Sequence, residues 1–344
     1  MLTILNGLTS DELHASLSHA GVTPRAARLL QMAAVRRGAF PDVGPGISSA
    51  VLEQVRSRAS IPRLEIVEKT TSPTDGFTKY LFRGTGPDLF EAVRIPLLHR
   101  PADRKYIICI SSQVGCSMGC VFCAAAKLGL RRNLAAWEMV DQVVRIREES
   151  EHPVGGVVFM GMGEPMLNYE DVIRAARILS EPSGVAISGK AITISTVGII
   201  PGIRRFTREG HPFRLVVSLT SADPARRREL LPIEEACPTP DLMEAIRAYH
   251  AATGRRVTLA WVMISGVNVR EEDARQLAEL TRGLPIRLDL IDVNDADGRF
   301  RPPSREELDA FRDALRKHVG MPVARRYSGG QDIRAGCGML VNRV

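Results

Sequence analysis

The sequence predicts an α/β protein: an open (β/α)6 partial TIM-type barrel, with a small N-terminal helical domain and a β extension in front of it. From Tyr106 onward, short apolar runs alternate with helix-compatible stretches, as parallel βαβ units require. Three capped helical patterns open the chain, and three β-like runs separate them from the alternating part. The 344 residues are enough for one large α/β domain and a smaller one.

The first hundred residues are expected to form the two accessory parts. Ser10 and Thr23 each precede a helical pattern that ends at a glycine, and a third pattern spans 49–60, so residues 1–62 are assigned to a helical domain. The β extension covers residues 63–100, and its three strands are expected at 64–69, 79–83 and 90–96.

The barrel is expected to cover residues 101–318, followed by a C-terminal segment, 319–344. Its six parallel strands are predicted at 106–111, 156–161, 192–196, 214–219, 256–264 and 286–293. With two strands fewer than a closed barrel, it should stay open on one side, where a large substrate could enter. Barrels of this type carry their chemistry at the C-terminal ends of the strands.

Three cysteines follow the first barrel strand in the string CSMGCVFC. Cys116, Cys120 and Cys123 have the spacing CxxxCxxC, which supplies three of the four ligands of a [4Fe–4S] cluster and leaves one iron open. An open iron can bind the amino and carboxyl groups of S-adenosylmethionine (SAM), whose sulfonium an electron can then cleave. A zinc site is disfavoured because no fourth Cys or His follows within the loop.

Polar side chains recur at the ends of the later strands. Gly163 and Glu164 follow the second strand in GMGEP, where a carboxylate would suit the amino group of SAM. The third, fourth and sixth strands end with Ser195, Ser218, Thr220 and Asn294. Each of these alone is a common cap or turn former. Their recurrence favours one shared ligand.

Two further cysteines lie outside the CxxxCxxC loop. Cys109 is on the first barrel strand, and Cys337 lies between two glycines in DIRAGCGML. Spare thiols beside a redox centre can act as nucleophiles or form a transient disulfide. The alternative is a buried strand cysteine and a tail cysteine, and the residues alone favour that simpler interpretation.

Charge and composition restrict the partners and the compartment. The net charge of +7 favours a polyanionic partner such as nucleic acid, although each arginine cluster could also be a solvated helix face. These clusters are Arg131-Arg132, Arg204-Arg205, Arg226-Arg227-Arg228 and Arg325-Arg326. No membrane span or secretory signal is visible, so we expect no membrane partner and a cytoplasmic location.

Several strings together resemble one family. CISSQVGCSMGCVFC, RRNL, GMGEPMLNYEDV, STVGIIPGI, GVN and DIRAGCG occur in the order and register of the RlmN/Cfr family of radical SAM enzymes. That family methylates an adenine of bacterial 23S ribosomal RNA, and this chain is closer to a divergent RlmN-like member. The resemblance implies methylation of adenine carbon 2 in 23S rRNA, and transfer RNA as a second substrate. It also implies a monomer that receives electrons from a donor such as flavodoxin or ferredoxin.

The resemblance gives the two spare thiols a mechanism that uses two SAM molecules per turnover. One SAM methylates Cys337, and the radical derived from a second takes hydrogen from that methyl group. The resulting methylene radical adds to the adenine carbon, and Cys109 then helps to release the product, ending as a disulfide with Cys337. Glu91 matches the family's proton acceptor, although it could be an exposed strand carboxylate, and Cys109 is the other candidate base.

The resemblance also implies a cofactor set. The residues that would hold SAM are Gly163, Glu164, Ser195, Ser218, Leu219, Thr220 and Asn294. Departures from the family pattern occur at Thr220, where a histidine is usual, and at Ala125, Ala126 and Asp295. They motivate a second hypothesis, the same dual-cysteine chemistry on a nucleotide or specialised metabolite. A third, a non-catalytic RNA-binding protein with a structural cluster, is disfavoured because it would need neither Cys109 nor Cys337.

Overall fold

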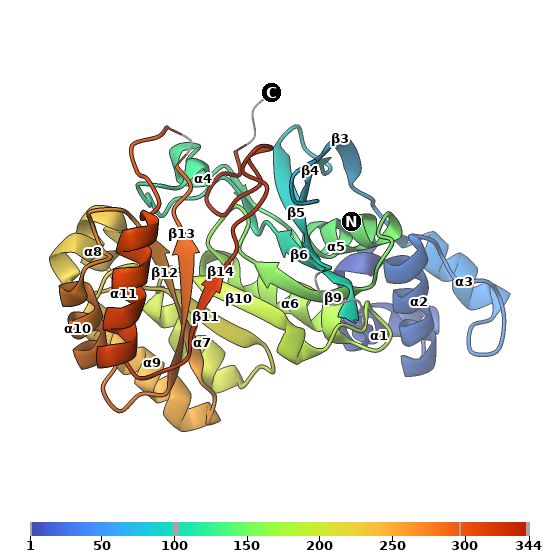
Figure 1. Ribbon diagram of the computed structural model, residues 1–344. Coiled ribbons are helices and arrows are strands. Elements are labelled where there is room, and N and C mark those ends of the chain that lie inside the picture. The colour runs from blue at the N-terminus through green and yellow to red at the C-terminus, as the bar shows by residue number, and fades with distance from the viewer. Residues whose placement is uncertain (1, 99–102, 296, 342–344) are drawn as a thin grey trace.

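One ten-stranded mixed sheet runs through the computed structural model, which describes residues 2–98, 103–295 and 297–341 (Figure 1). In chain order its strands are β3 Glu65–Thr71, β4 Thr78–Arg83, β5 Leu89–Leu97, β6 Lys105–Ile110, β9 Val154–Phe159, β10 Ile192–Thr196, β11 Arg214–Ser218, β12 Val257–Met263, β13 Ile286–Asp292 and β14 Val323–Arg326. Their order across the sheet is β14-β13-β12-β11-β10-β9-β6-β5-β4-β3.

The barrel part of the sheet is parallel from β6 to β14. All six predicted barrel strands are present, because strands covered on both faces are the apolar runs that a sequence shows most clearly. β14 is a seventh parallel strand, in the segment that we assigned to the C-terminal tail. The edge strands β3 and β14 do not pair with each other in the described residues, so the predicted open barrel is confirmed.

Helices connect the successive parallel strands. The long ones are α5 Ala136–Glu148, α6 Tyr169–Ser180, α7 Ile200–Glu209, α8 Pro224–Leu230, α9 Thr239–Thr253, α10 Glu271–Leu280 and α11 Arg305–His318. Short 3-10 turns lie at Leu5–Gly7, Ser18–Ala20, Pro165–Asn168, Gly189–Ala191 and Pro232–Glu235. Within the described residues, no helix combines the length and the apolar character that a bilayer crossing requires.

The β extension continues the barrel sheet. β3, β4 and β5 are antiparallel, and β5 pairs with β6 so that Val93 lies opposite Cys109. The extension therefore places its side chains directly beside the first barrel strand.

The N-terminal helices are α1 Ser10–Leu17, α2 Pro24–Arg37 and α3 Ser49–Arg56, with the short strand pair β1 Thr3–Ile4 and β2 Ala59–Ser60 (Figure 1). They enclose a small hydrophobic cluster of their own, which includes Leu13, Leu30 and Leu52. The predicted Ser10 cap is wrong. Thr9 caps α1 through a capping box with Glu12, because a hydroxyl and a carboxylate three residues apart satisfy each other's backbone N–H groups.

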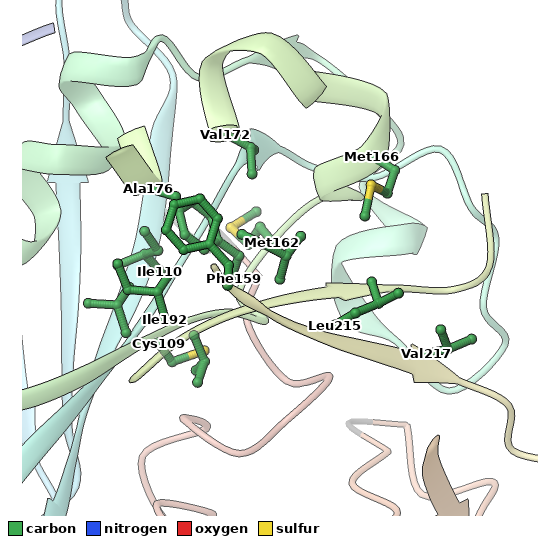
Figure 2. Packing of buried hydrophobic residues seen from close by; sticks show 14 of the residues in the cluster. Cys109, Ile110, Phe159, Met162, Met166, Val172, Ala176, Ile192, Leu215 and Val217 are labelled. Carbon is green, nitrogen blue, oxygen red and sulfur yellow. The ribbon is translucent and has the colours of Figure 1, made fainter. Parts of the chain in front are cut away.

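The main hydrophobic core lies between the sheet and its helices. Figure 2 shows Phe159, at the end of β9, and Met162 beside Val172 and Ala176 of α6. Cys109 belongs to the same cluster. Because such interiors are closely packed, the strand ends that carry the polar side chains are held rigidly.

Candidate active site

The CxxxCxxC loop begins after the two-residue strand β7 Gln113–Val114 and continues through α4 Ala124–Lys127 to β8 Arg132–Asn133. Its closure depends on Gly115, whose φ is +74° and whose added Cβ would lie 1.7 Å from the Gly129 carbonyl oxygen. The Cys116 N–H donates to that same carbonyl at 3.1 Å. Only glycine permits this approach, so the sequence dictates the closed base of the loop.

The three loop thiols lie in a desolvated environment. Burial raises the pKa of all three, that of Cys116 to about 12. Bound iron would reverse this effect, because a metal stabilises the thiolate directly. In the described residues, no three Cys, His, Asp or Glu side chains are grouped as ligands of a single metal ion. In a [4Fe–4S] cluster, each of the three loop thiolates would bind a different iron.

A pocket opens beside this loop and contains ≈ 880 Å³ of empty space, open mouth included. Its polar and sulfur-bearing lining includes Cys120, Cys123, Gly163, Glu164, Ser195, Ser218, Asn294 and Cys337. Leu231, Val262 and Ile291 supply apolar wall. The structure thus brings five of the seven predicted cofactor residues together with two cluster cysteines, and the mixed lining suits a ligand with a charged and a flat apolar end. We call this the cofactor pocket.

Among the described residues, Glu164 is one of two carboxylate residues that line the cofactor pocket, the other being Asp292. The Glu164 carboxylate accepts hydrogen bonds from the Met166 and Val197 N–H groups, both at 2.9 Å, and its own N–H donates to Gln113 at 2.8 Å. Burial raises its pKa to about 7. A cationic ammonium placed beside this buried carboxylate would restore its charge, as expected for the amino group of SAM.

A second pocket, with ≈ 460 Å³ of empty space including its mouth, lies next to the cofactor pocket. Cys109 and Cys337 both line it, and we call it the two-thiol pocket. Cys337 lines the cofactor pocket as well, so one thiol faces both spaces. Cys109 is buried and Cys337 is exposed. Burial raises the pKa of the Cys109 thiol, and the nearby Cys337 sulfur adds to the effect.

The Cys337 loop is fixed by hydrogen bonds to the barrel. The Ala124 N–H, next to Cys123, donates to the Gly338 carbonyl at 2.7 Å. Asn294 donates to the Cys337 carbonyl at 3.2 Å and to the Ser328 hydroxyl at 2.7 Å, and the Cys337 N–H donates to the same hydroxyl at 3.2 Å. Asn294 therefore joins the cofactor pocket to the reactive loop. Sequence reasoning missed Ser328, because no motif marks it.

Comparison with known proteins gives this arrangement a family. A family model described as the radical SAM superfamily matches residues 110–278. A probable RNA methyltransferase from Myxococcus xanthus (strain DK1622) is 48% identical, over 98% of this chain and 93% of that protein. A probable dual-specificity RNA methyltransferase RlmN from Leptospira interrogans (strain Fiocruz L1-130) is 38% identical, over 98% of this chain and 96% of that protein. The chain belongs to the RlmN-type radical SAM methyltransferases.

The fold agrees with that membership. A radical SAM methyltransferase from Sphaerobacter thermophilus superimposes with a TM-score of 0.87 at 37% sequence identity, covering 98% of this chain and 99% of that one. The accessory helices and the β extension therefore belong to the RlmN-type architecture as much as the barrel does.

Glu91 lines a different pocket from the two thiols in this RlmN-type chain. It is a buried residue of β5 that pairs with Lys79 at 3.1 Å, and its second carboxylate oxygen has no hydrogen-bond partner among the described residues. Burial raises its pKa. The pocket that it lines contains Lys79, Arg334 and Met339 but neither Cys109 nor Cys337. Its role as proton acceptor stays a prediction, while the expectation of an exposed strand carboxylate is wrong.

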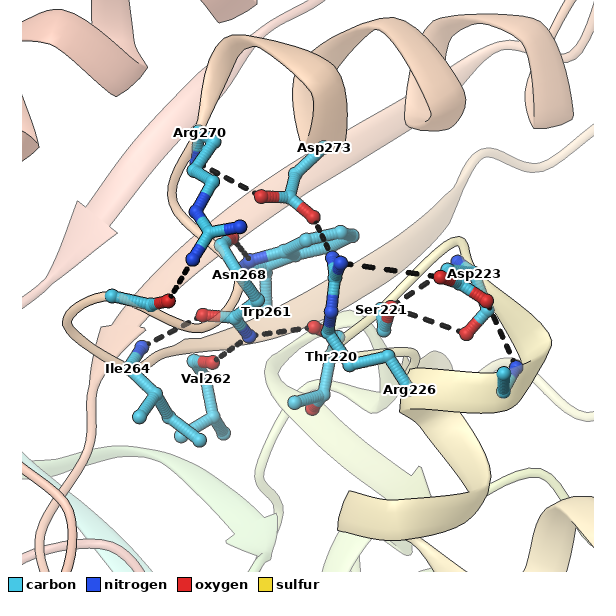
Figure 3. Close-up of polar contacts among 12 residues, drawn as sticks. Thr220, Ser221, Asp223, Arg226, Trp261, Val262, Ile264, Asn268, Arg270 and Asp273 are labelled. Atoms are coloured by element: carbon cyan, nitrogen blue, oxygen red, sulfur yellow. Dashed lines mark hydrogen bonds and ion pairs between the residues drawn. The ribbon is translucent and has the colours of Figure 1, made fainter.

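Leu219 and Thr220 are buried and outside the lining of the cofactor pocket. Thr220 has a φ of +60°, rare for a β-branched residue, and its hydroxyl has no hydrogen-bond partner in the described part of the chain. Figure 3 shows what holds it: the Asn268 amide donates to the Thr220 and Val262 carbonyls, each at 2.8 Å. This strained turn ends β11, where Ser218 faces the pocket. Cofactor contacts of Leu219 and Thr220 remain a prediction.

Two of the other departures have a structural explanation. The buried Asp295 carboxylate accepts the N–H groups of Asp297, Arg299 and Phe300 at 3.0–3.1 Å and pairs with Lys127 at 3.7 Å. It caps the loop after β13 and ties that loop to α4. Ala125 lines the two-thiol pocket, where its small side chain leaves space.

A buried ion pair supports the cofactor pocket from behind. Arg227 and Glu234 have 0% and 2% exposed side chains and contact each other directly. Arg227 also donates to the Val197 carbonyl at 2.7 Å, while the Val197 N–H binds Glu164. The sequence showed Arg227 only as a member of an arginine cluster. Its pairing with Glu234 is visible only in the folded structure.

Removing one partner of this pair should destabilise the protein strongly. Glu234→Ala is expected to lower the free energy of unfolding by about 3–5 kcal/mol, because a buried guanidinium loses its counter-charge. Urea unfolding of the purified protein measures this. The control is Arg228→Ala, at an exposed position of the same helix, with an expected change within about 0.5 kcal/mol. A double change, Arg227→Met with Glu234→Leu, should cost less than Glu234→Ala, and equal losses would contradict this account.

Proposed function

We propose that this protein methylates carbon 2 of an adenine in 23S rRNA, with transfer RNA as a second substrate, through an S-methylcysteine on Cys337. The observation that carries the proposal is the position of Cys337, which lines both the cofactor pocket and the two-thiol pocket. One sulfur can thus meet a methyl donor on one side and an acceptor base on the other without moving between sites.

The residues present fit the two groups that such chemistry needs. Cys116, Cys120 and Cys123 would hold a [4Fe–4S] cluster, and Glu164, Ser195 and Ser218 would orient SAM beside it. Bound there, these groups would supply a transferable methyl and, after reductive cleavage of a second SAM, a hydrogen-abstracting radical. The protein itself supplies the thiol that receives the methyl, on a loop that lines both pockets.

Cys109 is proposed to release the product. It lies on β6 opposite Val93 and shares the two-thiol pocket with Cys337. The Cys109 thiolate would attack the Cys337 sulfur, so that an S–S bond forms while the bond from that sulfur to the methylene carbon on the base breaks. The carbon would leave with the bonding electron pair and take up a proton, which gives the methylated base and a disulfide between the two cysteines. Burial raises the pKa of the Cys109 thiol. Glu91 is the proposed proton acceptor of the reaction, and Cys109 is the other candidate base.

RNA is the proposed partner for two reasons. The chain has a positive net charge, and its relatives are named RNA methyltransferases. The net charge is +7, and Arg131 and Arg228 are exposed. Other members of the arginine clusters have carboxylate partners: Arg132 with Glu138 and Arg325 with Asp292. We therefore assign phosphate binding to the exposed arginines of these clusters and not to those that already pair with a carboxylate. A monomeric cytoplasmic enzyme and a flavodoxin or ferredoxin electron donor complete the proposal.

A second candidate is the same chemistry on a nucleotide or specialised metabolite. The observation that favours it is the size of the two-thiol pocket, whose ≈ 460 Å³ of empty space could take a free purine. RNA is preferred because a free nucleotide would give no use to the exposed basic residues or the open side of the barrel.

The test is anaerobic reconstitution with iron, sulfide, reductant and methyl-labelled SAM, followed by addition of RNA from cells that lack the protein. We expect label in an adenosine that mass analysis identifies as methylated at carbon 2. Label on Cys337 with formation of 5′-deoxyadenosine but none in RNA would contradict the RNA assignment and favour the second candidate. Absence of both would indicate a non-catalytic protein.

A further inference from the structure

Tyr327 is the most exposed large side chain among the apolar and aromatic residues that the structure describes. It is 73% exposed, in a chain with only 5% aromatic residues. It follows β14 directly and leads into the loop that carries Cys337. Most of the ring surface beside the Cys337 loop is therefore free to contact a ligand.

The ring is held in place despite its exposure. Its hydroxyl donates to the Asp75 carboxylate at 3.0 Å, and the same carboxylate accepts the Gly330 N–H at 2.8 Å. Phe77 contacts the ring at a centroid distance of 6.1 Å and an interplanar angle of 72°. Asp75 and Phe77 belong to the turn between β3 and β4, so the extension fixes the ring from one side while most of its surface stays open.

Tyr327 lines the two-thiol pocket together with Cys109 and Cys337. The rest of that lining is largely apolar and includes Phe77, Val93, Ile95, Ala335 and Leu340. A purine is a flat, weakly solvated ring, and enzymes that modify a base inside RNA take it out of its stack and hold it against aromatic side chains.

We propose that Tyr327 is the stacking residue that receives the substrate's purine at the two-thiol pocket, with Asp75 as the positioning residue that fixes its ring. This proposal rests on the proposed function, because it takes the acceptor to be a base. It deepens that function by naming the residue that binds the substrate. The alternative is that Tyr327 merely packs on Phe77 to close the C-terminal loop, which predicts a stability effect and no effect on substrate affinity.

The first test compares Tyr327→Leu, which removes the ring, with Tyr327→Phe, which keeps it. Base–aromatic stacking corresponds to a loss of roughly 5- to 150-fold in affinity on removal of the ring. We expect Tyr327→Leu to raise the KM for RNA at least tenfold while kcat changes by less than about threefold, and Tyr327→Phe to stay near wild type. Asp75→Asn should give an intermediate KM. Val43→Ala, at an exposed apolar position of the N-terminal region, is the control.

The second test measures binding directly, with an RNA oligonucleotide that carries one unpaired 2-aminopurine. Stacking quenches the fluorescence of this base, so wild-type protein should quench it and Tyr327→Leu should not. Equal quenching, or an unchanged KM in Tyr327→Leu, would overturn the proposal, as would a lowered melting temperature that accounts for the whole effect. If wild-type protein quenches the probe but methylates no RNA, the stacking role stands and the proposed function fails.

Discussion

Replacement of Cys120 by alanine is expected to abolish cluster binding. Two remaining thiolates leave two irons of a cubane exposed to water, and the pocket beside the loop is open to solvent, so the cluster should be lost during purification. Cys116→Ala and Cys123→Ala should behave in the same way. Iron per chain should fall from about four to near zero, together with the brown colour and the visible charge-transfer absorbance.

The matched control is Cys237→Ala. Cys237 is also buried, but it lies between α8 and α9 and lines neither of the two pockets. The Cys237→Ala variant should retain its full iron content. It thereby distinguishes the loss of a cluster ligand from a general effect of removing a buried thiol. Normal iron content in any of the three loop variants would show that the ligand assignment is wrong.

The barrel could be predicted from sequence because of how its strands are buried. Strands covered on both faces, such as β9 with Val157, Val158 and Phe159, are short apolar runs that stand out from their surroundings. β14 could not be found in this way. It is an edge strand with the sequence VARR, and its two arginines pair with Asp292 and Asp289 of β13, a relation that only the fold reveals.

The same contrast holds in the site: residues that act within one segment could be predicted from the sequence, and residues that act by contacting a distant segment could not. The CxxxCxxC loop and the GEP string one strand later each lie within one segment, so their residue types and spacing were enough to predict Cys116 and Glu164 as site residues. Ser328 and Arg227 act by reaching a different segment, the first at Asn294 and the second at Val197. Thr220 shows the limit of a strand-end pattern. The residue has a left-handed backbone and is buried outside the lining of the cofactor pocket, so its predicted contact with the cofactor stays a prediction.

The last prediction separates the two thiols of the two-thiol pocket. Cys337→Ala removes the methyl acceptor, so no methyl should reach protein or RNA. Cys109→Ala leaves that acceptor intact and removes the thiol that frees the product. The second variant should therefore accumulate RNA joined covalently to Cys337, whereas the first should carry none.

The expected link between Cys337 and the base is of the thioether type, so it should survive denaturation and reductant. After nuclease digestion, mass analysis should find a nucleotide-sized addition on the peptide that carries Cys337. Both variants should keep normal iron, because neither residue is in the CxxxCxxC loop. If Cys109→Ala carries no covalent RNA while Cys337→Ala still methylates, the roles assigned to the two thiols are wrong. The two cysteines would then share a pocket only because of packing, and Cys337 would not be the residue that carries the methyl group from donor to base.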